Sequence, residues 1–560
     1  MKKLDRRTML KAAAGAVVGA TFGRRGFAAV PKRSADLVLT GGNIITVCDK
    51  QPLAQAMAVS GGQVTAVGSD QEISQYVGGD TKVIPLAGRC VSPGLIDAHS
   101  HVIGFGQMQL KYVVVRPPKV KDFATLNREL AAAAKKTPPG EWIVARGFNT
   151  FAEGRFPRRW EIDEAVPNHP VLAIHWGGQF GVANTMAMKR ANLLRADAKD
   201  PYGGKYLRDR SGVPDGVLLH YPAIYSVHQP VLDDREQLEC AEWGLKQMAA
   251  QGITCVHDNF CNPRYARAYV WLERAGRLPC RVRVYPYVPT LEHCRRLVQK
   301  VQRYRGPLVR LQGVKLAVDG YALMYKVPAE HRHLAIPMHP QPRFEEIVKT
   351  IHNAGMQADV HAVGDKGVDW TLGAFMKAAG SAAECRRRRH RIEHFVFRKA
   401  DSIRYAAALG VPVCIQPNFI EVRAEDMVAK MGIRPIHSML PGRTFVKEGV
   451  RIAYGADVPA FPSHSPMDSI RSAMDRRTAT GRRLDPGEAV SFTEALQHHT
   501  LGGAYAALDE TEIGSLEPGK LADFVVWTGD LRRVGSGAAV AGLRPAATYL
   551  AGKAVYEAAS

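Results

Sequence analysis

Two histidines one residue apart, His99 and His101, are the first residues of this sequence whose types and spacing could do chemistry. They close an apolar run that begins at Val91. In an extended strand, residues i and i+2 point to the same side, so the two imidazoles can face one point. Imidazole nitrogens are common ligands of divalent metals, and the pair therefore predicts half of a metal site. The alternative is an ordinary histidine pair on a surface.

Four further ionisable residues lie in or just after later apolar segments. They are Lys315, His361, His394 and Asp457. A lysine between apolar neighbours is costly to bury without a partner. Each residue alone has another explanation: a buried histidine with satisfied hydrogen bonds, a salt-bridged lysine or a helix-capping aspartate. Together the four are explained better as part of one site than as separate packing positions.

The elements that must position these residues alternate along the chain. A helix is predicted at 235–250, and apolar strands are predicted at 253–258, 313–318, 357–361, 391–395, 413–416 and 451–455. Such alternation indicates parallel strands with helical crossovers. Ionisable residues end many of the strands, whereas a doubly wound sheet concentrates its site at one switch point. The pattern thus favours an α/β fold, a (β/α)8 barrel with the site at its C-terminal mouth.

The two ends of the chain have a different sequence pattern. Short β-like segments separated by glycine turns occupy 35–47, 56–67 and 82–86, and similar segments return at 522–527 and 546–556. Because chain ends often lie close together, we predict one composite β-sandwich from residues 31–94 and 508–560, flanking a barrel at 95–507. The proline- and glycine-punctuated region 110–235 predicts an α+β subdomain inserted in the barrel and overhanging the mouth.

The composition is that of a globular protein with an unusual charge. The 560 residues are 46% hydrophobic and 23% charged, and the formal net charge is +22. Such a charge suits a nucleic-acid partner, an anionic substrate or a membrane or cell-wall surface. Basic residues are spread widely, and the densest run, 386–389, is predicted to be a solvated loop. We therefore expect no nucleic-acid partner.

The first thirty residues predict a targeting signal. The pair Arg6-Arg7 precedes an alanine-rich apolar stretch at 12–22 that is too short to span a membrane, and small residues follow at 26–29. This pattern predicts a twin-arginine signal peptide at 1–30, recognised by the twin-arginine export machinery, and a periplasmic or otherwise exported protein. A basic, frayed N-terminus is the alternative. No later segment predicts a transmembrane helix.

The sequence resembles the metal-dependent amidohydrolase superfamily, and more closely its family 3, the YtcJ-like branch that includes N-substituted formamide deformylases. The resemblance rests on Pro93-Gly94-Leu95-Ile96-Asp97-Ala98-His99-Ser100-His101, on the lysine, two histidines and aspartate that follow in that order, and on Gly455-Ala456-Asp457-Val458-Pro459.

This resemblance implies one or two divalent metal ions, usually zinc, and hydrolysis at a carbon–nitrogen bond. Lys315 would link two ions if it is carboxylated, because a carbamate is an anionic oxygen ligand; the alternative is an uncarboxylated, ion-paired lysine. Asp457 would also carry the proton from water to the departing nitrogen. By position, the first ion would be held by His99, His101 and Asp457, and the second by His361 and His394.

The sequence also predicts substrate contacts. Gln179 stands where family members commonly have a histidine, so either Gln179 or the nearby His175 is expected to contact the substrate. Three residues at predicted mouth positions are further candidates, each with a structural or supporting role as the alternative. They are His257, Gln416 and His464.

The expected function is that of an exported metal-dependent hydrolase acting on a small-molecule amide, formamide or cyclic amide. A metal-dependent esterase or isomerase on the same scaffold is the first alternative. A non-catalytic exported binding protein is the second, and Asp457 argues against it because a binder needs no proton shuttle. A homo-oligomer is compatible with the sequence.

Overall fold

The computed structural model describes residues 34–149, 151–227, 230–300, 304–431 and 439–559. The predicted export signal at 1–30 lies outside these residues. Within them, no helix combines the length and the apolar character needed to cross a membrane.

The centre of the molecule is built from two parallel sheets, of strand order β17-β16-β15-β8 and β18-β19-β20-β21-β22. Their strands are largely apolar because both faces of such a sheet are covered. They comprise β8 (Leu95–Ser100), β15 (Ile253–Cys261), β16 (Arg281–Pro286), β17 (Val309–Leu311), β18 (Gly313–Ala317), β19 (Gln357–Ala362), β20 (Arg391–His394), β21 (Val413–Ile415) and β22 (Ile452–Tyr454).

Backbone hydrogen bonds join the two sheets at both edges. Beside β16 and β18, the amide of Val288 donates to the carbonyl oxygen of Lys315 at 3.2 Å. At the other edge, the amide of Asp457 donates to the carbonyl oxygen of His99 at 2.7 Å. β17 and β18 are separated by Gln312 alone and pair in succession with β16 and with Tyr287 after it, so the two form one barrel strand. The result is the predicted (β/α)8 barrel, with β8 next to the segment that follows β22.

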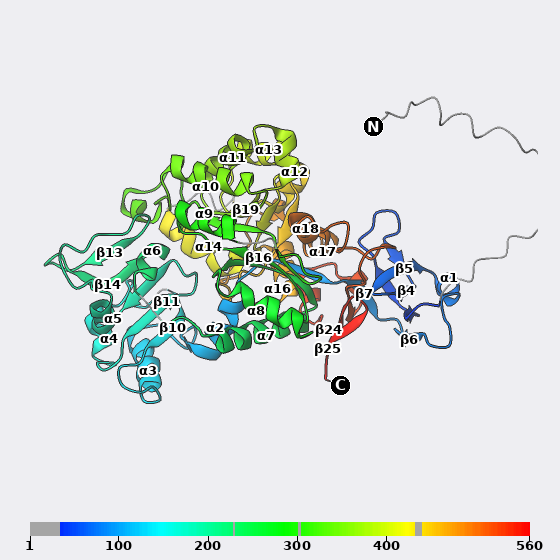
Figure 1. The fold of residues 1–560 in the computed structure, drawn as a ribbon, viewed down its shortest axis with the longest axis horizontal. Helices are drawn as coiled ribbons and strands as arrows, with labels where there is room; N and C mark the ends of the chain where they lie inside the picture. Colours follow the sequence, from blue (N-terminus) through cyan, green and yellow to red (C-terminus); the bar gives the residue numbers. More distant parts are fainter. Residues whose placement is uncertain (1–33, 150, 228–229, 301–303, 432–438, 560) are drawn as a thin grey trace, which may run out of the picture.

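Helices follow the barrel strands and cover them from outside (Figure 1). The predicted helix at 235–250 is confirmed as α7, whose capping box between Asp233 and Glu236 fixes its start. These helices include α2 (Val102–Lys111), α7 (Asp234–Ala250), α8 (Ala266–Arg274), α9 (Leu291–Lys300), α10 (Gln341–Asn353), α11 (Asp365–Ala379), α13 (Ala400–Leu409), α14 (Asn418–Met431), α16 (Pro466–Asp475) and α18 (Leu501–Ala506).

Both chain ends contribute to two β layers beside the barrel, at the right of Figure 1. One sheet has the order β5-β4-β1-β6 and the other the order β25-β24-β23-β7-β2-β3, and one buried hydrophobic cluster contains side chains from both. This is the predicted composite β-sandwich. Its strands include β1 (Leu37–Thr40), β2 (Asn43–Ile45), β3 (Leu53–Ala54), β4 (Ala56–Ser60), β5 (Gln63–Gly68), β6 (Lys82–Pro85), β7 (Cys90–Pro93), β23 (Phe524–Trp527), β24 (Pro545–Leu550) and β25 (Lys553–Glu557).

Between β8 and β15 the chain forms a separate mixed sheet of order β13-β14-β12-β11-β10-β9, at the left of Figure 1. This is the α+β insertion that the sequence predicted. Its elements include β9 (Val113–Val114), β10 (Ile143–Phe148), β11 (Val171–His175), β12 (Phe180–Ala183), β13 (Lys205–Arg208), β14 (Pro214–Leu219), α3 (Phe123–Ala134), α4 (Arg159–Asp163), α5 (Thr185–Arg190) and α6 (His220–Tyr225).

Candidate metal centre

The six predicted metal-site residues line one cavity of about 620 Å³. Each comes from the C-terminal end of a barrel strand or from the strand itself. His99 lies in β8, Lys315 in β18 and His361 in β19, while His394 ends β20. Of the remaining two, His101 directly follows β8, and Asp457 lies three residues after the end of β22. The strand order therefore gathers residues that are more than 350 positions apart in the sequence.

Three of the six form the tightest donor group. One ligand atom from each of His99, His394 and Asp457 lies within 4.8 Å of the others. The backbone of His394 (φ +78°) and of Asp457 (φ +53°) is left-handed, which turns the chain sharply where each strand ends. This group differs from the two sets of metal ligands that the resemblance implies. There, His99 and His394 belong to different ions, whereas here they lie in one group.

The other two histidines border this group. The Nε2 atom of His101 lies 3.0 Å from Oδ1 of Asp457, and the corresponding atom of His99 lies 3.5 Å from the same oxygen. The ring centroids of His361 and His394 are 4.4 Å apart. The buried Nε2 atom of His361 makes no hydrogen bond, although Oδ1 of Asp319 is 3.3 Å away.

Neighbouring groups orient three of the imidazoles through their Nδ1 atoms. Glu393 contacts His99, the backbone oxygen of Asn259 contacts His101, and Oε1 of Gln416 lies 2.6 Å from Nδ1 of His394. A metal ligand typically donates its second ring N–H to such an acceptor, which leaves the first nitrogen's lone pair free. The arrangement points Nε2 of each ring towards the donor group.

Burial keeps His99, His361 and His394 neutral. It lowers the pKa of His99 well below its ordinary value, and the nearby charge of Lys315 lowers it further. Burial also lowers the pKa of His394 well below its ordinary value and that of His361 to about 3. A neutral imidazole is the form that binds a metal ion.

Lys315 belongs to a chain of buried charges beneath the cavity. Its Nζ atom lies 3.0 Å from Oδ1 of Asp359, and both side chains are almost completely buried. Arg391 follows, with Nε 3.6 Å from Oδ2 of Asp359 and 2.6 Å from Oε1 of Glu393. Glu393 in turn contacts His99. Lys315 thus occupies the ion-paired arrangement that the sequence left open as one alternative.

Sequence reasoning missed Asp359, Arg391 and Glu393. A signal was present, because Asp359 precedes His361 by two residues, and Arg391 precedes Glu393 by two. Residues at this spacing face the same side of a strand. Polar pairs at that spacing within otherwise apolar strands would have indicated an inward-facing polar cluster.

Of the predicted substrate contacts, Gln179 lines the cavity. His175 instead packs among Phe148, Trp176 and Phe180. The remaining three candidates do not belong to the described residues that line the cavity, and each contacts another side chain. His257 accepts a hydrogen bond from Arg391 at 2.9 Å, Gln416 bonds His394, and the ring of His464 packs on Phe105.

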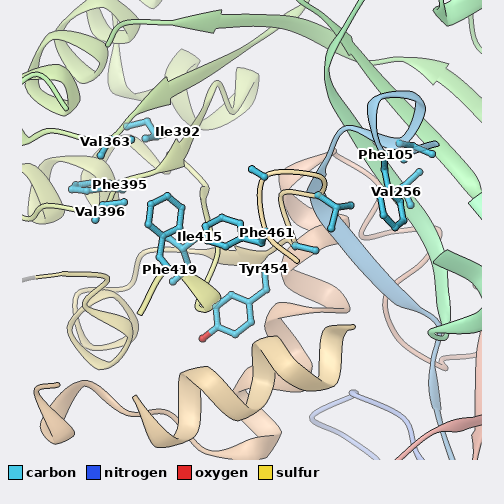
Figure 2. Close-up of a cluster of buried hydrophobic side chains, with 14 of the residues drawn as sticks. Phe105, Val256, Val363, Ile392, Phe395, Val396, Ile415, Phe419, Tyr454 and Phe461 are labelled. Carbon is cyan, nitrogen blue, oxygen red and sulfur yellow. The ribbon is translucent and has the colours of Figure 1, made fainter. Parts of the chain in front are cut away.

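Aromatic side chains form much of the cavity wall. On one side the rings of Phe260 and Tyr287 are stacked with centroids 3.8 Å apart, and Tyr221 of α6 packs against Phe260 at 5.1 Å. On the other side, the rings of Phe419 and Phe461 lie next to each other, 4.9 Å apart (Figure 2). The insertion therefore completes a cavity whose floor is provided by the barrel.

The chain is similar to known proteins over most of its length. The sequence model of the amidohydrolase family matches residues 82–556. Protein LONG AFTER FAR-RED 3 of Arabidopsis thaliana is 29% identical over 518 residues, covering 88% of this chain and 87% of its own. N-substituted formamide deformylase of Arthrobacter pascens is 27% identical over 539 residues, covering 89% and 96%.

A solved structure shares the fold. The crystal structure of an uncharacterized metal-dependent hydrolase from Pyrococcus horikoshii OT3 superposes with a TM-score of 0.71 at 23% identity, covering 89% of this chain and 98% of that one. The family match extends over most of the sequence, from β6 to β25, and confirms the predicted resemblance. The chain belongs to the amidohydrolase family.

Proposed function

We propose that this protein is a metal-dependent hydrolase that cleaves a non-peptide carbon–nitrogen bond in a small amide, formamide or cyclic amide. The observation that carries the proposal is the donor group of His99, His394 and Asp457, within 4.8 Å of one another and lining a cavity. The relative from Arthrobacter pascens, an N-substituted formamide deformylase by name, supports this bond type.

The donor group fits a catalytic zinc ion. Two neutral imidazole nitrogens and one carboxylate oxygen are ligands that zinc prefers, and three protein ligands leave a position open for water or substrate. We therefore propose zinc, held by these three residues with His101 beside them.

The ion pair of Lys315 with Asp359 argues against a second metal ion bridged by a carboxylated Lys315. A carbamate there would place a second buried negative charge next to Asp359, whose Oδ1 atom is 3.0 Å from Nζ. Two buried like charges repel strongly in a medium of low dielectric constant. We propose that Lys315 acts as an ammonium ion.

Zinc in this position supplies Lewis acidity, which lowers the pKa of water and polarises a carbonyl group. Asp457 accepts the proton of the attacking water and delivers it to the departing nitrogen, so that water and amide yield an acid and an amine. Gln179 offers its side-chain N–H groups to the substrate carbonyl. The aromatic walls exclude bulk water from the apolar part of the substrate.

The variant Asp457→Asn tests this role. The asparagine side chain keeps the size of the aspartate and an oxygen atom that can still bind the metal, but it accepts no proton at neutral pH. We expect most of the bound metal to remain and hydrolysis of N-substituted formamides to fall by at least about 100-fold. Asp401→Asn, at an exposed position of α13, is the control. Full activity of Asp457→Asn would exclude Asp457 as the proton shuttle.

We also propose export through the twin-arginine pathway, supported by Arg6, Arg7 and the apolar stretch after them. Cell fractionation of the full chain and of an Arg6→Lys/Arg7→Lys double variant tests this. The intact chain should reach the periplasm and the variant should stay in the cytoplasm. Equal distribution of the two would contradict the proposal.

A further inference from the structure

One guanidinium group in the cavity is buried without a hydrogen-bonding partner. Arg423, on α14, is 4% exposed and lines the cavity. Its Nε and Nη2 atoms make no hydrogen bond. Three aromatic rings surround the group, with Cζ 4.7 Å from the ring centroid of Trp176, 5.1 Å from that of Tyr321 and 5.6 Å from that of Phe419. Aromatic faces stabilise the charge but satisfy none of its in-plane N–H donors.

A second guanidinium lines the same cavity from the insertion. Arg146 lies in β10, and its buried Nε atom likewise makes no hydrogen bond. Burial of its charged group lowers the pKa of this guanidinium, and the charge of Asp457 is the one carboxylate among the causes that oppose this shift. The turn after β11 contacts both cations, because the ring of Trp176 packs on Arg423 and a Cβ atom at Gly178, two residues later, would lie 3.4 Å from Nη2 of Arg146.

The cavity offers these cations little negative charge. Among the described residues that line it, the carboxylates are Asp258 and Asp457. Asp258 already accepts hydrogen bonds from the hydroxyl of Tyr269 and the amide of Val102, and Asp457 belongs to the metal donor group. No ion pair joins Arg146 or Arg423 to any carboxylate in the part of the chain that the structure describes. By contrast, Lys315, which also lines the cavity, forms an ion pair with Asp359.

Buried cations without partners are rare because desolvation is costly, and a bound anion removes that cost. We propose that Arg423 and Arg146 form an anion subsite, so that the substrate of this hydrolase is an amide that also carries a carboxylate. This inference rests on the proposed function for the reaction and on the unpaired guanidinium groups for the substrate class. A planar guanidinium matches a carboxylate through two parallel N–H···O hydrogen bonds.

The subsite lies close to the reacting centre. Phe419 connects the two, since its ring contacts His394 with centroids 5.8 Å apart and lies beneath the guanidinium of Arg423. A cavity of about 620 Å³ accommodates a small molecule that reaches both places. The stacked rings of Phe260 and Tyr287 line the same cavity and suit an aromatic or apolar body of the substrate.

Matched substrates test the charge requirement. The zinc-loaded enzyme is assayed with N-formylphenylalanine and with its neutral amide, N-formylphenylalaninamide. We expect kcat/KM to favour the carboxylate by about 10- to 100-fold, the range for a hydrogen bond to a charged group. Arg423→Gln should reduce this ratio at least about 10-fold, and Arg533→Gln, at an exposed arginine of the β-sandwich, should leave it unchanged. Equal rates for the two substrates with the wild-type enzyme would overturn the proposal.

A binding experiment tests the anion subsite independently of the hydrolysis reaction. Isothermal titration calorimetry of the zinc-loaded protein compares benzoate, benzamide and phenyl phosphate. Benzoate should bind at least about 10-fold more tightly than the other two, and Arg423→Gln should abolish the advantage. If no amide is hydrolysed but this pattern holds, the subsite stands and the proposed reaction fails. Equal binding of benzoate and benzamide, or a benzoate affinity that Arg423→Gln does not change, would overturn the subsite; tighter phenyl phosphate binding would overturn its carboxylate specificity.

A second variant covers the case in which Arg423→Gln does not fold. Arg146→Gln removes the other guanidinium and should reduce the same two ratios. Circular dichroism and the thermal unfolding midpoint identify which variant is folded. An unchanged ratio in a folded Arg146→Gln enzyme would remove Arg146 from the subsite.

Discussion

Nδ1 of His99 forms a hydrogen bond with the carboxylate of Glu393, and both side chains are fully buried. A carboxylate at Nδ1 fixes the imidazole tautomer and its orientation, and it raises the basicity of the other nitrogen. Glu393 is itself held by Arg391. The relationship links the first residue of the histidine pair to the buried charges beneath the cavity.

Weakening this bond should weaken metal binding. Glu393→Gln preserves the size of the side chain but removes its charge, so His99 becomes a poorer ligand. We expect the affinity for zinc to fall about 10- to 100-fold, measured by competition with a chromogenic chelator. Glu448→Gln, at an exposed position, is the control. Equal affinities in both variants would show that Glu393 does not act through His99.

The ion pair between Arg281 and Asp523 should matter for stability, because it joins a barrel strand to the terminal β layers. The two groups make two hydrogen bonds, of 2.7 and 2.9 Å, and both are buried. Asp523→Asn leaves a buried cation without its counter-charge, which costs about 3–5 kcal/mol of unfolding free energy. The exposed pair of Asp401 and Arg404 should contribute less than about 1 kcal/mol. Thermal unfolding midpoints compare Asp523→Asn with Asp401→Asn, and equal shifts would be inconsistent with this account.

His390 should make stability depend on pH. Its Nδ1 atom accepts a hydrogen bond from the amide of Ala358 at 2.9 Å, and burial lowers its pKa to about 3. An unfolded histidine titrates near pH 6.5, so the unfolded state binds more protons below that pH. Its contribution is complete above pH 6.5 and is lost as the pH falls towards 3. Between pH 7 and pH 5 the loss is about 2 kcal/mol. Chemical unfolding at the two pH values should show a smaller difference for His390→Gln than for the wild type; identical differences would refute this role.

Zinc binding should not require carboxylation of Lys315 by carbon dioxide. If its ammonium form is stabilised by Asp359, protein purified with or without bicarbonate should contain the same amount of zinc, one ion per chain. Elemental analysis of the two preparations provides the measurement. A second ion that appears only with bicarbonate would instead support a bridging carbamate.

The barrel and the six residues at its mouth could be predicted because their signals are local. An apolar strand followed by His361 or His394 can be recognised without knowing its neighbours. The charges of Asp359, Arg391 and Glu393 could not be paired in this way, because each partner lies on a different strand. Their network depends on the order in which the sheet brings the strands together.

The burial of Arg423 and the packing of the insertion could not be predicted from the sequence. On a helix, an arginine is usually exposed, and its burial here requires Trp176 from the insertion to cover it. Likewise, His175 and Gln179 are four residues apart, and only Gln179 lines the cavity because the chain turns at Gly177 and Gly178 after β11 ends. Such outcomes depend on how the insertion packs over the barrel, which local sequence patterns do not specify.

The central claim is that His99, His394 and Asp457 hold a metal ion. Crystals of the zinc-loaded protein, with diffraction data collected on both sides of the zinc absorption edge, test it most directly. We expect an anomalous difference peak between these three side chains. A peak bound by other residues, or no peak in protein whose zinc content has been confirmed by elemental analysis, would contradict it.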